Sequence, residues 1–244
     1  MNNQETVDQL NELKLNGMAT AFEAMLNMPL QARPTVEQAV AKMVEVEKGY
    51  RRNKRTALFL KGSKLRYNAV LEEVLCSTSR NFTKDQLYAL ADCGFIRRNE
   101  NLFIQGKCGC GKSFLACAIG HQACFLGYRT MYYNMNRFVE KIMVSKLDGT
   151  LLKFIESMGK YQLLILDDFG LQPMDDNTRL TLLQILEDRY DKASTIVVSQ
   201  LPIDQWYDYL GEPATIADAI MDRLVSNVNR IELKGESLRR KKGK

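Results

Sequence analysis

The stretch Asn101–Ser113, NLFIQGKCGCGKS, joins a short apolar run to eight residues that match G-x-x-x-x-G-K-[ST] at every fixed position. A helical pattern, SFLACAIGHQACFLG, follows and closes at Gly127. A strand, a glycine-rich turn and a helix in this order are typical of a phosphate-binding loop, because glycine lets successive backbone N–H groups point at phosphate oxygens. The stretch therefore predicts an α/β core with a nucleotide site.

The loop residues are expected to hold a nucleoside triphosphate and its metal ion. Lys112 would reach the β and γ phosphates, where it also acts in catalysis, and the hydroxyl of Ser113 would bind Mg²⁺. Cys108 and Cys110 occupy variable positions of the pattern and do not indicate a metal held by sulfur. No G-x-G-x-x-G spacing is present, which disfavours a dinucleotide fold. The expected nucleotide contacts are Gly106, Lys107, Cys108, Gly109, Cys110, Gly111, Lys112, Ser113 and Phe114.

A second motif, LLILDDFG at Leu163–Gly170, ends an apolar run with two carboxylates. Ligands of a parallel sheet bind at the carboxyl ends of its strands. Asp167 is expected to hold Mg²⁺ directly or through water, and Asp168 to orient and deprotonate an attacking water. Together the two motifs predict Mg²⁺-dependent hydrolysis of a nucleoside triphosphate.

A third apolar run, STIVVSQ at Ser194–Gln200, ends in two polar side chains. Ser199 or Gln200 would emerge between the other two strand ends, where such a group can sense the γ-phosphate or position the water. Simple capping of the strand is the alternative interpretation.

Arg223 lies in ADAIMDRLV, a predicted helix beyond the sheet. An arginine from a neighbouring subunit can neutralise the charge that phosphoryl transfer spreads over the γ-phosphate. On its own the position does not require this role, since a helix arginine is more often solvated or paired, here with Asp218 or Asp222.

The composition sets the class of protein. With 244 residues and 45% hydrophobic side chains the chain can bury a large core, and no apolar run approaches the roughly 20 residues that span a bilayer. The amino terminus lacks the layout of a secretory signal, so we expect a cytoplasmic protein without a membrane. Six cysteines without a CxxC pair indicate reduced thiols, and the single histidine, His121, does not indicate a structural metal site.

The hydrophobic pattern of the sequence changes near residue 81. Residues 1–80 show helical spacing broken by Pro29 and Pro34. Residues 81–234 alternate apolar runs with helical segments, as a parallel sheet covered by helices requires. We therefore predict an all-helical domain at 1–80, an α/β domain at 81–234 and a basic tail at 235–244.

Basic residues gather between Lys48 and Arg66, where no acid occurs. If the segment is helical, four of them recur at i, i+3, i+4 and i+7 and form one stripe that can follow a phosphate backbone. A solvated surface helix is the alternative. The expected DNA contacts are Lys48, Arg51, Arg52, Lys54, Arg55, Lys61, Lys64 and Arg66.

These residues resemble the IstB family of helper ATPases of insertion-sequence transposition, which belong to the AAA+ class and are similar to DnaC-type helicase loaders. The resemblance rests on both parts of the chain. It is carried by Phe95–Cys124, Leu163–Asp176, Leu182–Trp206 and Ala217–Arg240, and by LKLNGMATAFEAML and GYRRNKRTALFLKGSKLR in the amino-terminal part.

The resemblance implies a five-stranded AAA+ core that binds ATP and Mg²⁺. It also implies ATP-dependent assembly of a homo-oligomer on duplex DNA and cooperation with a partner transposase. Many AAA+ proteins carry Glu where Asp168 stands, so the attacking water would lie closer to the backbone here. The implied roles are nucleotide and Mg²⁺ ligands for Lys112 and Ser113, the acidic pair for Asp167 and Asp168, the first sensor for Ser199 or Gln200, the arginine finger in trans for Arg223, and a second sensor or DNA contact for Arg239 or Arg240.

Three other functions stay open at this point. A DnaC-like replicative helicase loader would share the ATPase core but differ in its amino-terminal partner surface. A small-molecule kinase would use the same loop but leave the basic helical segment unexplained. A purely architectural DNA-binding protein is disfavoured by the intact Lys112, Ser113 and Asp167.

Overall fold

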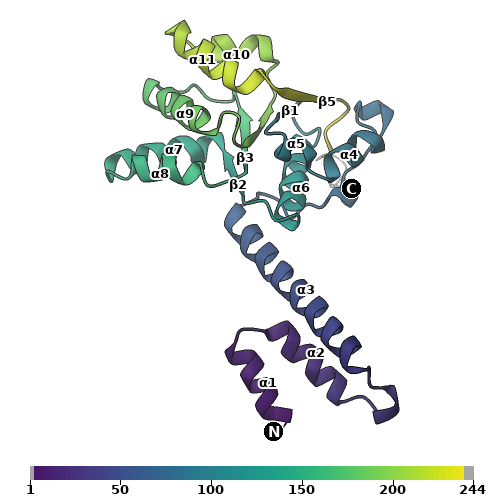
Figure 1. Ribbon diagram of the computed structural model, residues 1–244. Helices are drawn as coiled ribbons and strands as arrows, with labels where there is room; N and C mark the ends of the chain where they lie inside the picture. The colour runs from purple at the N-terminus through teal and green to yellow at the C-terminus, as the bar shows by residue number, and fades with distance from the viewer. Residues whose placement is uncertain (1–2, 239–244) are drawn as a thin grey trace. The chain divides into compact units, whose positions relative to one another are not determined.

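The computed structural model describes residues 3–238, and its contacts divide the chain into two compact units, residues 1–58 and 59–244 (Figure 1). This boundary lies before the predicted one at residue 80, because Ala69 and Leu71 are buried in the same cluster as Leu102 and Ile104 of the sheet. Among the helices described in residues 3–238, none is long and apolar enough to cross a membrane.

The first unit is helical, as predicted. It comprises α1 (Asn3–Glu12), α2 (Asn16–Leu26), the short 3-10 turn η1 (Leu30–Ala32) and most of α3 (Val36–Ser63), whose last residues belong to the second unit. Pro29 and Pro34 lie on either side of η1, where the helical pattern was expected to break.

A buried carboxylate joins α2 to α3 within this unit. A Cβ on Gly17 would lie 2.6 Å from the Cα of Glu47, so only glycine allows the two helices to approach this closely. The carboxylate of Glu47 accepts hydrogen bonds from the backbone N–H groups of Gly17, at 2.7 Å, and Met18, at 3.2 Å. These groups start α2 and favour a negative charge.

The second unit contains the predicted five-stranded parallel sheet, in the order β2-β3-β4-β1-β5. The apolar runs of the sequence form the strands because side chains buried on both faces make a continuous hydrophobic stretch. The strands are β1 (Asn101–Gly106), β2 (Thr130–Asn134), β3 (Leu163–Phe169), β4 (Ser194–Ser199) and β5 (Val228–Leu233).

Alternate residues of the strands enter two separate cores. Leu163 and Ile165 pack with the residues of α6, whereas Leu164 and Leu166 pack in the cluster that contains Phe138. The first cluster is covered by α4 (Lys84–Ala91), α5 (Gly94–Arg97) and α6 (Lys112–Phe125), with the turns η2 (Leu71–Glu73) and η3 (Thr78–Arg80) before them. The second is covered by α7 (Met135–Leu147), α8 (Leu151–Met158), α9 (Asp176–Arg189), α10 (Trp206–Leu210) and α11 (Ala214–Val225), with η4 (Ile203–Gln205) leading into α10.

Because the five strands are parallel, their carboxyl ends lie at one edge of the sheet. Figure 1 shows the helices on either side of the strands in the second unit. The central position of β1 and β4 puts the loop that follows β1 next to the ends of β4 and β3, where a ligand is expected in a sheet of this kind.

Candidate nucleotide-binding site

The loop between β1 and α6 adopts a backbone that its glycines permit. Gly106 has φ +152° and Gly111, directly before α6, has φ +91°. A Cβ on Gly106 would lie 2.2 Å from the carbonyl oxygen of Leu233, so a side chain there would push β5 away. The loop therefore passes close to the sheet and ends with the N–H groups of α6, which start at Lys112.

Lys112 is a buried cation for which the described residues provide no carboxylate partner. The residue is 7% exposed, and its Nζ donates a hydrogen bond of 3.0 Å to the carbonyl oxygen of Lys107. Within residues 3–238 no acid lies within ion-pair distance of this ammonium group. A buried charge is costly without a counter-ion, so the position favours an anion above the loop.

Asp167 is fully buried and held by three donors. Ser113 Oγ donates to its Oδ1 at 3.1 Å, the Asp168 N–H donates to the same oxygen at 2.9 Å, and the Tyr132 hydroxyl donates to Oδ2 at 2.6 Å. Burial raises the pKa of Asp167, and the bonds from Tyr132 and Ser113 partly oppose this. The carboxylate and the Ser113 hydroxyl thus lie side by side, as two oxygen ligands of one cation would.

Asp168 occupies an irregularity at the end of β3. The pairing of β3 with β4 shifts register between Leu166 and Phe169, and Asp168 has φ +60°, which is uncommon for a residue with a side chain. Its Oδ2 accepts a hydrogen bond of 2.5 Å from Asn134 Nδ2 and lies 3.5 Å from a guanidinium nitrogen of Arg66. The bulge turns the second carboxylate out of the sheet while the first stays inside.

The structure separates the two candidates at the end of β4. Ser199 is buried, and its hydroxyl donates to the carbonyl oxygen of Phe169 at 2.7 Å and accepts from the N–H of Leu201 at 3.0 Å. Gln200 is exposed and lines the same cavity as Lys112. Gln200 is therefore the better placed of the two to contact a nucleotide.

A cavity of about 630 Å³ opens above the loop. Cys108, Gly109, Gly111, Lys112, Ser113, Phe114, Asp168 and Gln200 contribute to its polar and loop side. The other side is mostly apolar and comes from the segment before β1, which also contributes Glu73 and Arg80, and from β5, through Tyr67, Val74, Leu75, Phe82 and Leu233. A polar loop at one end and an apolar wall at the other suit a phosphate chain joined to a base. Of the remaining predicted contacts, Gly106 ends β1, Lys107 lies in the loop, and Cys110 is a buried loop residue.

Four polar residues of this region were not predicted from the sequence as part of a nucleotide site. Arg80 Nη2 donates to the carbonyl oxygen of Cys110 at 2.5 Å, which places its guanidinium on the phosphate loop. Tyr132 and Asn134, on β2, contact the two aspartates. Arg66, predicted as a DNA contact, pairs with Asp168. A polar residue at the end of β2 is a signal that could have indicated Asn134, because the carboxyl ends of parallel strands meet at one edge.

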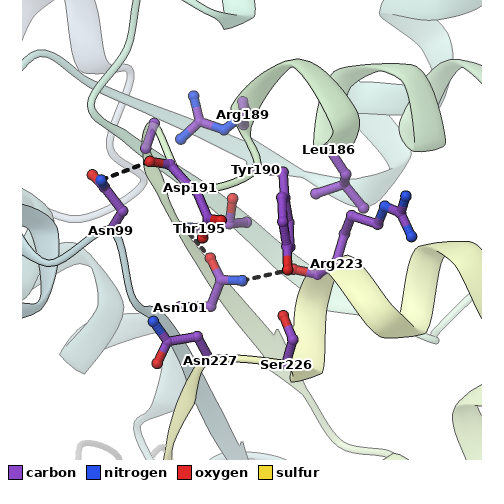
Figure 2. A pocket seen from close by; sticks show the side chains of 11 residues that line it. Asn99, Asn101, Leu186, Arg189, Tyr190, Asp191, Thr195, Arg223, Ser226 and Asn227 are labelled. Atoms are coloured by element: carbon purple, nitrogen blue, oxygen red, sulfur yellow. Dashed lines mark hydrogen bonds between the residues drawn. The ribbon is translucent and has the colours of Figure 1, made fainter.

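Arg223 lies at the opposite edge of the sheet. It lines a small pocket with Asn101 of β1 and Thr195 of β4, residues at the amino ends of their strands. Figure 2 shows the Arg223 side chain near Tyr190, while its backbone carbonyl oxygen accepts from Asn101 Nδ2 at 2.9 Å. Its guanidinium pairs with Glu187 at 2.7 Å and with Asp222 at 3.0 Å, and stacks over Tyr190.

The predicted DNA contacts are all exposed, and the helix they were expected to form is present. Lys48, Arg51, Arg52 and Arg55 lie on α3 with one-face spacing. Lys54, Lys61, Lys64 and Arg66 are exposed as well. Arg51 is not simply solvated, because its Nε donates to Glu47 at 2.6 Å. Arg239 and Arg240, named above as a second sensor or DNA contact, lie outside the described residues.

The geometry is that of a nucleotide site, and comparison with known proteins gives the family. A family model described as an IstB-like ATP binding protein matches residues 8–244. This chain belongs to the IstB-like family. It is therefore an insertion-sequence ATP-binding protein, which agrees with the resemblance noted in the sequence.

Curated relatives of this IstB-like protein carry similar names. The insertion sequence ATP-binding protein y4pL of Sinorhizobium fredii is 40% identical over 96% of this chain and 96% of its own length. The insertion sequence IS21 ATP-binding protein of Pseudomonas aeruginosa is 27% identical over 95% of this chain and 87% of its own length.

Solved structures show the AAA+ fold of the IstB-like protein. The crystal structure of the DnaC helicase loader matches with a TM-score of 0.56 and 20% identity, over 70% of this chain and 100% of that chain. AMPPCP-bound DnaA from Aquifex aeolicus matches with a TM-score of 0.58 and 20% identity, over 74% of this chain and 55% of that chain. This chain thus spans about half of the DnaA structure, and the likeness concerns the fold.

Proposed function

We propose that this protein hydrolyses ATP with Mg²⁺, assembles as an oligomer on duplex DNA and cooperates with a partner transposase of its insertion sequence. The observation that carries the nucleotide part of the proposal is the buried ammonium group of Lys112, which has no acidic partner in the described chain and lies beside a cavity large enough for a nucleotide. Its charge is compensated when a phosphate chain is bound.

The residues near the strand ends have different roles in the proposed hydrolysis. Lys112 and the N–H groups of the loop hold the phosphates, while Arg80 adds a second positive charge beside the loop. Asp168 orients the attacking water and takes its proton, and Gln200 contacts the γ-phosphate or the water. Tyr132 keeps Asp167 in place, since burial raises the pKa of the Tyr132 hydroxyl and leaves it protonated as a donor.

The donor set suits Mg²⁺. Ser113 and Asp167 provide a hydroxyl and a carboxylate oxygen that lie 3.1 Å apart. Mg²⁺ is usually bound by one or two protein oxygens together with phosphate and water oxygens. Bound there, the cation would neutralise charge on the β and γ phosphate oxygens.

Two observations support the proposed partners, duplex DNA and a transposase. The first unit carries an exposed basic stripe on α3, and phosphate contacts of this kind bind DNA without reading its sequence. The relatives are named as ATP-binding proteins of insertion sequences, which are moved by transposases, and this supports a transposase as the second partner.

A nucleotide-dependent assembly test addresses the proposal directly. Wild-type protein and Lys112→Ala are mixed with a duplex in ATP, ADP or no nucleotide and studied by electron microscopy and sedimentation velocity. We expect ordered oligomers on duplex only for wild type in ATP, because Lys112→Ala loses the phosphate chain's main counter-ion.

Lys160→Ala is the matched control, since it removes an exposed lysine of the same unit outside the cavity and should assemble as wild type does. Monomers that ignore both nucleotide and duplex would refute the proposal. Equal assembly by Lys112→Ala would show that the loop does not control it.

A further inference from the structure

A second, open cavity lies on the other side of Asp168. Its volume is about 940 Å³, and it is formed by residues of the second unit only. Its walls include Tyr132 and Tyr133 of β2 and Val144 of α7. The charged residues that line this basic groove are Lys64, Arg66, Arg137, Lys141, Glu140 and Asp168.

The groove has an excess of positive charge. Glu140 is paired with Arg137 at 3.0 Å, and Asp168 with Arg66 at 3.5 Å. Lys64 and Lys141 are exposed and form no ion pair within residues 3–238. Two uncompensated ammonium groups in one open cavity favour an anion with more than one charge.

The shape favours a polymer over a single phosphate. Arg137 and Lys141 lie one turn apart on α7, while Lys64 and Arg66 come from the segment that precedes the sheet. The cations are therefore spread along the groove rather than focused on one point. Spaced cations in an open groove match the repeated phosphates of a nucleic acid backbone.

The groove is connected to the proposed catalytic site through one oxygen atom. Asp168 Oδ2 is engaged both by Asn134, at 2.5 Å, and by Arg66, at 3.5 Å. While Arg66 faces this oxygen, a water molecule competes with a guanidinium for it. A phosphate in the groove offers Arg66 a stronger partner, because guanidinium and phosphate match in charge and geometry.

We propose that this groove binds the phosphodiester backbone of duplex DNA and that its occupation draws Arg66 from Asp168, so that DNA binding accelerates ATP hydrolysis. The inference rests on the proposed function and adds a second DNA contact and its regulatory effect. Arg66 acts here as a positioning residue, while Asp168 is the group that meets the water.

The binding part is tested with Arg137→Gln/Lys141→Gln in the full chain. Duplex affinity is measured by fluorescence anisotropy at several salt concentrations. We expect weaker binding and a salt slope lower by about two, since each lost phosphate contact removes about 0.9 units of slope. Lys153→Gln, an exposed lysine on neighbouring α8 outside the groove, is the matched control and should bind as wild type does.

The coupling part is tested by the ratio of ATP hydrolysis with and without duplex. Arg66→Gln is expected to raise the DNA-free rate and bring the ratio close to one, because Asp168 is released in the absence of DNA. If Arg66 had only a structural role, Arg66→Gln would lower the rate of ATP hydrolysis both with and without duplex. Arg137→Gln/Lys141→Gln should lower the ratio at a fixed, subsaturating duplex concentration, and Lys153→Gln should retain it.

The outcomes separate this inference from the function on which it rests. Wild type that binds no duplex or hydrolyses no ATP would overturn both. Wild type that does both, together with a double variant that binds like Lys153→Gln, would overturn the groove alone. Hydrolysis by wild type that duplex leaves unchanged, or an Arg66→Gln variant slower in both states, would overturn the coupling.

Discussion

Two neighbouring aspartates at the end of β3 occupy contrasting environments. Asp167 is fully buried, whereas the Asp168 side chain is 22% exposed and faces two cavities. The bulge between Leu166 and Phe169 contributes to this difference, because strict alternation would place Asp168 on the face of Leu164 and Leu166, in the second core, whereas the bulge turns its side chain out of the sheet. One carboxylate is thus suited to hold a cation and the other to meet water.

The burial of Asp167 has a measurable effect on stability without ligands. Its pKa is raised above the ordinary 3.8 in the folded chain, so the folded state holds the proton more tightly than the unfolded state. Stability therefore falls as pH rises from 3.8 through the raised value. Asp167→Asn is expected to remove this fall and to unfold at the same or a higher temperature than wild type at pH 7, as measured by calorimetry without nucleotide.

Asp175→Ala provides a control at a carboxylate whose effect on stability changes with pH in the opposite direction. Hydrogen bonds from Thr178, through its side chain and then its backbone N–H, hold the pKa of Asp175 below the ordinary value, and the N–H bond caps α9. Its loss should cost about 1 kcal/mol at pH 7, and less as pH falls.

With ATP present, adding Mg²⁺ should raise the unfolding temperature of wild type but not of Asp167→Asn. An Asp167→Asn variant that unfolds below wild type at pH 7 would contradict the destabilising effect of burial, and one that responds to Mg²⁺ as wild type does would contradict the cation role.

At the scale of elements, the helix α3 that carries the basic stripe is held to α2 by one of its own acidic residues. Glu47 joins α2 to α3 and also accepts from Arg51, one turn later. Removing Arg51 would leave the buried carboxylate with one fewer donor, so its loss would affect folding as well as DNA contact. Lys48 and Arg55 test the stripe without this complication.

Lys48→Ala/Arg55→Ala is expected to weaken duplex binding and to lower the salt slope by about two, at ~0.9 units per lost contact. The two residues lie seven positions apart on one face of α3. Lys42→Ala is the matched control on the same helix, because Lys42 is paired with Glu45 and lies outside the predicted contacts. An unchanged slope in the double variant would assign DNA binding elsewhere.

The elements were predictable where the pattern is local. The three apolar runs at residues 101–105, 163–168 and 194–200 became β1, β3 and β4, and the phosphate loop lies between β1 and α6, because burial on both faces and glycine at positive φ give recognisable patterns in a sequence. The segment from Lys64 to Phe82 has no such pattern. Arg66 and Arg80 reach the site from there only through tertiary packing. The choice between Ser199 and Gln200 likewise depends on which side chain the sheet edge buries.

At the scale of the whole molecule, the phosphate loop and Arg223 lie at opposite ends of β1. The loop follows the last residue of β1, and Arg223 contacts the first, so six residues of strand separate them by about 17 Å. The guanidinium is meanwhile held by Glu187 and Tyr190. Within one subunit Arg223 is therefore too distant to contact the phosphates, and a role in hydrolysis requires a second copy of the chain.

Mixing two inactive variants tests this requirement. Arg223→Ala retains its own phosphate loop but offers no arginine to a neighbour, while Asp168→Asn keeps the loop and offers the arginine but lacks the group that takes the proton of the attacking water. Each alone should hydrolyse ATP at least ~100-fold more slowly than wild type, since an arginine finger is worth 10³–10⁵ in rate. Mixed on duplex, they should regain a substantial fraction of the activity, because some interfaces pair an intact Asp168 with an intact Arg223. Arg97→Ala, an exposed arginine paired with Asp92, should stay active alone. If the mixture is no faster than its parts while each variant still joins oligomers with wild type, Arg223 does not act between subunits, and its ion pair with Glu187 is structural.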